Sequence, residues 1–77
     1  MLNINYDKIF YECLSFIKNN KLDDAKNHAL KYFYKTELDK MGILNSKSSL
    51  ELIKFLAGYD MMSDNIKIYY VDPTLAI

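Results

Sequence analysis

The sequence predicts a small, mainly helical domain of three helices followed by a short C-terminal β-strand. Three observations lead to this prediction. Apolar residues recur at helical spacing in three segments, and residues that favour helix ends flank those segments. One late segment instead alternates β-branched and aromatic residues. With 77 residues, the chain is expected to form one domain over residues 1–77.

The first helix is predicted over Tyr6–Asn19, after an extended arm at Met1–Asn5. Asn5 can cap this helix, because an asparagine side chain accepts a hydrogen bond from the unpaired N–H groups of the first turn. One face of the segment is apolar and the opposite face is polar. The apolar face carries Tyr6, Ile9, Phe10, Cys13, Leu14, Phe16 and Ile17. The short connection at residues 19–21 predicts an antiparallel hairpin with the next helix.

The second helix is predicted to run unbroken over Leu22–Ile43 and to lie at the centre of the fold. Asp23 and Asp24 place negative charge at its N-terminus, where unpaired backbone N–H groups favour it. Gly42 can take the left-handed conformation that closes a helix. The apolar residues of this segment form two faces, so we expect it to contact two neighbouring elements.

A third helix is predicted from about Ser49 to Gly58, with Ser48 and Glu51 forming a capping box at its start. Apolar residues cover more than half of its circumference. Helices of this kind are buried on several sides. In so small a chain, one of those sides could belong to a second molecule.

The segment Ile66–Val71 is predicted to be a β-strand that ends at Asp72-Pro73. One face of the strand would carry Ile66, Ile68 and Tyr70. A lone strand leaves its backbone groups unpaired and needs a partner. The candidates are the arm at Leu2–Ile4, the same strand of a second copy, or a strand of another protein.

The charge balance bears on the class of partner. Ten basic and ten acidic residues give a formal charge of zero, whereas nucleic-acid-binding proteins usually carry a basic excess. No apolar run approaches the roughly 20 residues that cross a bilayer, and no secretory signal is recognisable. A single cysteine excludes an internal disulfide and suits a reducing compartment. We therefore expect a cytoplasmic protein that binds neither membrane nor nucleic acid.

The reactive residues are few and scattered. Cys13 falls on the apolar face of the first helix, where a thiol acts as a small hydrophobic group. His28 is the only histidine, and single ligands do not hold zinc. The carboxylate pairs follow no calcium-loop pattern. We therefore expect no enzymatic activity, no metal and no cofactor.

An alternative hypothesis is a DNA-binding transcriptional regulator. Thr36–Gly58 resembles a helix-turn-helix segment, with a helix, a turn and a second helix that begins with serines. The turn is longer than the usual three or four residues. The second helix offers Lys54 as its one basic residue and has no arginine to read guanine edges.

The most informative feature of the composition is the large number of aromatic residues and methionines: seven tyrosines, four phenylalanines and four methionines in 77 residues. Tyrosine and methionine are favoured at protein interfaces. The predicted partner-binding residues are Phe55, Met61, Met62, Tyr69 and Tyr70, with Tyr11 and Tyr34 at the periphery. The alternative is that these side chains only cover a shallow core, because protein surfaces are normally more than half apolar.

The leading hypothesis is a non-enzymatic regulator or inhibitor that covers the surface of a partner protein. Small immunity-type or phage-encoded inhibitors fit this description, although no motif points to one. A chain this short buries only about 60% of its unfolded surface, so contact with another chain would stabilise it. The sequence leaves open whether that chain is a second copy, forming a homodimer, or another protein.

Overall fold

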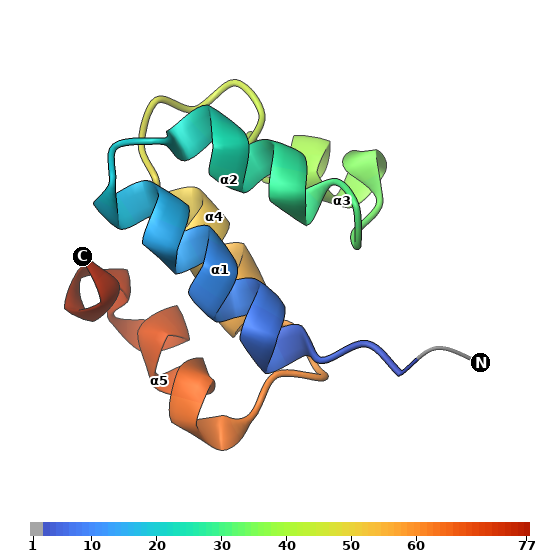
Figure 1. Ribbon diagram of the computed structural model, residues 1–77, viewed down its shortest axis with the longest axis vertical. Coiled ribbons are helices and arrows are strands. Elements are labelled where there is room, and N and C mark those ends of the chain that lie inside the picture. The colour runs from blue at the N-terminus through green and yellow to red at the C-terminus, as the bar shows by residue number, and fades with distance from the viewer. Residues whose placement is uncertain (1–2) are drawn as a thin grey trace.

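The structure, a computed structural model, describes residues 3–77 and contains in them five α-helices and a closing 3₁₀ turn (Figure 1). The elements are α1 (Tyr6–Lys18), α2 (Leu22–Ala29), α3 (Lys35–Lys40), α4 (Leu50–Ala57), α5 (Asp64–Val71) and the turn η1 (Pro73–Ala76). The predicted mainly helical class is confirmed. The predicted number of helices and the predicted strand are wrong, since residues 3–77 contain no strand.

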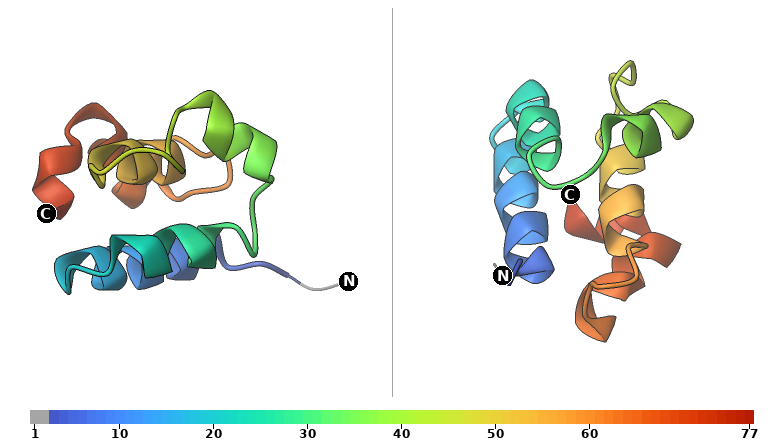
Figure 2. Two further views of the ribbon diagram at one scale, coloured as in Figure 1. Left: turned by 90° about the horizontal axis from the view of Figure 1, so that it is seen from above. Right: turned by 90° about the vertical axis from the view of Figure 1, so that its right-hand side faces the viewer.

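The helices form two layers (Figure 2). Helices α1 and α2 lie side by side and antiparallel in one layer, and α3, α4 and α5 form the other (Figures 1 and 2). The chain passes between the layers at residues 30–34. The core lies between the layers and is wholly apolar, because no polar or charged residue within 3–77 is buried. Among the helices of this range, none combines the length and apolar character needed to cross a membrane.

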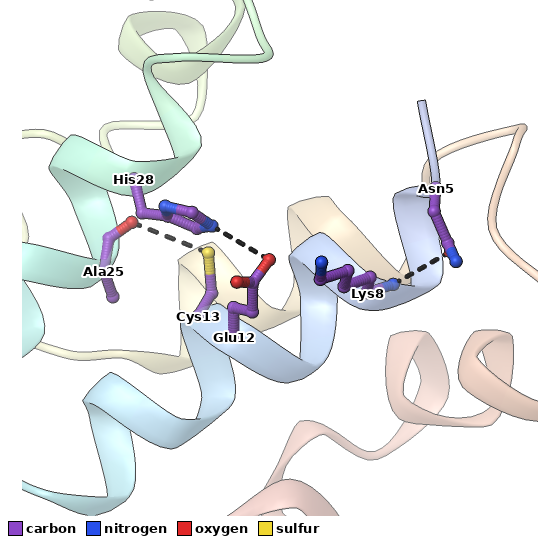
Figure 3. Close-up of polar contacts among 6 residues, drawn as sticks. All are labelled: Asn5, Lys8, Glu12, Cys13, Ala25 and His28. Carbon is purple, nitrogen blue, oxygen red and sulfur yellow. Dashed lines mark hydrogen bonds and ion pairs between the residues drawn. The ribbon is translucent and has the colours of Figure 1, made fainter. Parts of the chain in front are cut away.

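Helix α1 begins at Tyr6 as predicted and ends at Lys18, one residue before the predicted Asn19. The Lys8 backbone N–H donates to Oδ1 of Asn5 at 3.1 Å, which is the predicted cap (Figure 3). At the other end, Asn20 takes the left-handed conformation with φ 59°. The Lys21 N–H then donates to the Phe16 carbonyl at 2.8 Å, which closes the helix and reverses the chain.

Small side chains let α2 lie close to α1. Ala25 and Ala29 form the buried face of α2, and both are fully covered. Cys13 lies opposite them on α1 and donates its thiol hydrogen to the Ala25 carbonyl, with an Sγ···O distance of 3.6 Å. The predicted apolar face of α1 is confirmed, since its buried residues are Ile9, Phe10, Cys13, Leu14 and Ile17.

The prediction of one helix over Leu22–Ile43 is wrong, because the chain breaks between α2 and α3. Tyr34 is extended, with φ −68° and ψ 137°, and α3 begins directly after it. The two apolar faces explain the break. The face with Ala29 packs on α1, and the face with Leu38 is buried in the other layer. Two short helices can point these faces in different directions, which one straight helix cannot do.

The predicted closure at Gly42 is confirmed. Gly42 has φ +69°, and its N–H donates to the Asp39 carbonyl at 3.0 Å. The Ile43 N–H donates to the Leu38 carbonyl at 3.1 Å, and both side chains are buried. This pair of hydrogen bonds and the apolar contact beside it define a Schellman motif.

Helix α4 is buried on two sides, as predicted, but its start differs from the predicted capping box. The Ser46 hydroxyl donates to the Glu51 carboxylate at 3.2 Å, and Ser48 Oγ accepts from the Leu50 N–H at 3.2 Å. The serine that pairs with the glutamate is therefore two residues earlier than the pattern indicates. The buried residues of α4 are Leu52, Ile53, Leu56 and Ala57.

The predicted strand at Ile66–Val71 is wrong, because these residues belong to α5. Within α5 the residues that turn inward are Ile66 and Tyr69, spaced by three as on one side of a helix. A helix pairs its backbone groups within the segment, whereas a strand here would have no partner. The proposed pairing with the arm is not formed by Asn3–Asn5, and Leu2 lies outside the described residues.

Alanine substitutions distinguish the observed helix from the predicted strand at residues 66–71. Ile66 is fully buried, so Ile66→Ala should lower the free energy of unfolding by about 2–5 kcal/mol. Ile68 is exposed, so Ile68→Ala should change it by no more than about 0.5 kcal/mol. Urea denaturation measures both values. Equal losses would contradict the helix, because a strand would place both side chains on one face.

Candidate functional site

Large apolar side chains are concentrated on the surface at the C-terminus. Five of them are exposed within ten residues: Ile68 (54% exposed), Tyr70 (49%), Val71 (85%), Leu75 (63%) and Ile77 (60%). We call these five residues the C-terminal apolar surface. Single exposed apolar residues are ordinary, whereas adjoining ones are typical of an interaction site, and Ile68 and Val71 adjoin on α5.

The arrangement of α5 explains this exposure. Its inner side carries Ile66 and Tyr69, and the Tyr69 ring stacks on Phe10 of α1 with centroids 5.6 Å apart. Its outer side carries Ile68 and Val71, which are three residues apart and therefore neighbours on the helix. Helix α5 lies at the edge of the molecule, with no other element outside it (Figure 1). Asp64 and Lys67 share this outer side, so it is mixed, whereas a surface helix normally has a polar outer side.

A groove of about 360 Å³ adjoins this surface and lies between α3, α4 and α5. Its apolar lining comes from Met41, Phe55, Tyr59 and Tyr70. Gly58 allows α5 to come this close, because a Cβ atom at that position would lie 2.5 Å from the Tyr70 ring. Tyr70 therefore belongs to both the groove and the C-terminal apolar surface.

Three charged residues also line the groove: Glu37, Lys54 and Asp60. The Lys54 ammonium lies over the Tyr70 ring, 5.7 Å from its centroid. Within residues 3–77, the only ion pair closer than 4.0 Å joins other residues, so neither groove carboxylate is paired with Lys54.

The carboxylates of Glu37 and Asp60 act on Tyr59, which also lines the groove. The pKa of Tyr59 is raised, first by hydrogen bonding with Tyr6, then by burial and interaction with Tyr6, and further by the carboxylates of Glu37 and Asp60. Nearby negative charge disfavours the phenolate, which is itself negative.

The structure brings together part of the predicted partner-binding set. Phe55 and Tyr70 line the groove, and half-buried Tyr69 lies on the inner side of α5. Met62 is only 3% exposed and belongs to the core, so its predicted surface position is wrong. The remaining predicted residues are exposed on other parts of the chain: Met61 before α5, Tyr11 on α1 and Tyr34 before α3.

The sequence analysis missed most of the C-terminal apolar surface and the polar part of the groove. The missed side chains are Ile68, Val71, Leu75 and Ile77 of the surface and Glu37, Met41, Lys54, Tyr59 and Asp60 of the groove. A helical wheel of residues 64–71 would have shown apolar residues on both sides of the segment. No local signal could have placed Asp60 beside Glu37, since they come from different elements.

Cys13, Glu12 and His28 are neighbours between α1 and α2 (Figure 3). His28 Nε2 lies 3.4 Å from Glu12 Oε1, and its ring packs between Phe16 and Tyr32. Burial, and secondly the charge of Glu12, raise the pKa of the Cys13 thiol to about 12. A nucleophilic cysteine needs the opposite shift, so the thiol acts here as a core group.

The structure also bears on the possibility of a metal site and on the DNA-binding hypothesis. Within residues 3–77, no three histidine, cysteine, aspartate or glutamate side chains come together as a metal site. The second helix of the predicted helix-turn-helix segment, α4, has most of its side chains in or against the core. Lys54 is the one basic residue it exposes.

Comparison with known protein families, curated proteins and solved structures finds no match for this chain.

The buried thiol of Cys13 gives a direct test of the packing between α1 and α2. Below about pH 9 the thiol is protonated in both the folded and unfolded chains. Because its pKa is higher in the folded chain, the stability that it contributes is lost as the pH rises from about 9 to about 12. Alkylation by iodoacetamide at about pH 8.5 should therefore be at least about a hundredfold slower than in urea. Similar rates in both states would contradict the burial of Cys13.

Proposed function

We propose that this chain is a small, non-enzymatic protein-binding regulator or inhibitor that acts by covering the surface of a partner protein. The observation that carries the proposal is the C-terminal apolar surface on α5 and η1. Its outer residues, Ile68 and Val71, are not needed for the core, which α5 reaches through Ile66 and Tyr69.

The compact shape of the chain and its exposed apolar side chains support the same proposal. The radius of gyration of 11.3 Å is close to the roughly 11.5 Å expected of a compact domain of this length. The single chain is therefore compact in the structure, and in our proposal a bound protein covers surface that is already formed. Burial of large apolar and aromatic side chains supplies most of the affinity in such interfaces.

A double variant tests the proposal. Val71→Asp combined with Leu75→Asp places two charges in the C-terminal apolar surface at exposed positions, so the helical circular dichroism should not change. The tagged wild-type chain should retain a specific protein from the cells in which it is native, and the double variant should lose it. Light scattering of the pure chain then shows whether that protein is a second copy.

Ile4→Asp provides the matched control, because Ile4 is also exposed and apolar but lies in the N-terminal arm. This variant should retain the partner as the wild type does. The proposal fails if the wild-type chain retains no protein and does not self-associate. It also fails if the double variant binds as strongly as the wild type.

A further inference from the structure

The groove between α3, α4 and α5 already holds a cation. The Lys54 ammonium lies over the Tyr70 ring, which is the geometry of a cation–π interaction. Lys54 is exposed at the end of a flexible stem, so it can turn into solvent at little cost. The Tyr70 ring therefore marks a position that accepts a positive charge and can be vacated.

Two carboxylates flank this position without an ion-pair partner among residues 3–77. Glu37 comes from α3, and Asp60 comes from the turn after α4. Both line the groove together with Tyr59, and both contribute to raising the pKa of that phenol. The lining residues, one lysine and two carboxylates, carry a net negative charge. The Lys67 ammonium, 3.4 Å from the Asp60 carbonyl oxygen, offsets part of this charge at Asp60, and Glu37 still favours an incoming cation over a phosphate.

The apolar lining selects the form of the cation. Met41 and Phe55 offer an apolar wall against which an aliphatic stem can lie. Tyr59 and Tyr70 offer aromatic faces. A guanidinium group is planar, stacks on aromatic rings and has five N–H donors, so it can bond two carboxylates at once. An ammonium group is compact and more strongly hydrated, and it uses this combination less well.

We propose that this groove binds an arginine side chain of a partner protein, presented next to apolar residues that contact the adjoining C-terminal apolar surface. The inference rests on the proposed function and names the chemistry of the partner. All ten basic residues of this chain are lysines, so a second copy cannot supply the arginine. Lys54 occupies the cation position in the free protein and is displaced when the partner binds.

The test uses a capped peptide, acetyl-Ala-Leu-Arg-Leu-Ala-amide, titrated into the ¹⁵N-labelled full chain. Saturable NMR shift changes are expected at the backbone amides around Glu37, Lys54 and Asp60. Glu37→Gln and Asp60→Asn should each weaken binding about two- to fivefold, because each removes one partner of the guanidinium. Lys54→Met should strengthen binding by a similar factor, about two- to fivefold, because it removes the competing cation.

Two controls make the result specific. Asp39→Asn makes the same change of charge on α3, but its side chain does not line the groove, so binding should not change. A peptide with neutral citrulline in place of arginine should produce no saturable shift in the groove. The proposal is overturned if the citrulline peptide binds as well, or if Glu37→Gln and Asp60→Asn have no more effect than Asp39→Asn.

The result can be separated from the proposed function. If the wild-type chain captures a partner that the combined Glu37→Gln and Asp60→Asn variant captures equally well, the groove proposal fails and the protein-binding function stands. If the wild-type chain neither captures a protein nor self-associates, the proposed function itself fails, whatever the peptide does.

Discussion

Phe33 is the contact on which the two-layer arrangement depends. It lies where the chain passes from α2 to α3, and it is buried. Its ring meets Phe55 and Tyr59 edge-on, with centroids 5.3 and 4.9 Å apart, and Tyr6 at 5.9 Å. These partners come from the first turn of α1, from α4 and from the turn that follows it. One aromatic side chain thus joins both layers at the break, and the position of α3 beside α4 follows from it.

How well each element could be predicted depends on how many structures its pattern allows. Helix α1 has one apolar face and a capping asparagine, and these features fit only a helix. The segment over 22–43 has two apolar faces, which fit either one central helix or two helices separated by a break. Residues 66–71 fit a strand by alternation and a helix by the spacing of Ile66 and Tyr69. Only packing with the rest of the chain decides such cases.

The same distinction applies to the candidate site. The excess of tyrosine and methionine drew attention to the C-terminal third, and Phe55 and Tyr70 do line the groove. The groove itself depends on contacts between elements, above all on the Tyr70 ring lying against Gly58. The sequence could not reveal it, because the error about residues 66–71 assigned Tyr70 to the wrong kind of element. Met62 was misplaced because it lies in the turn before α5, where no helical or strand pattern indicates which side chains are buried.

Taken together, the chain completes its own core with one side of α5 and leaves Ile68 and Val71 exposed on the other side. The most direct measurement of this claim is a set of methyl NOE contacts for Ile68 and Val71 in the pure protein. We expect contacts within α5 and to residues 72–77 only, with strong effects from a paramagnetic agent dissolved in the solvent. Contacts from these methyl groups to α1–α4, or extended-chain chemical shifts over residues 64–71, would contradict the claim, because no apolar side would then be left for a partner.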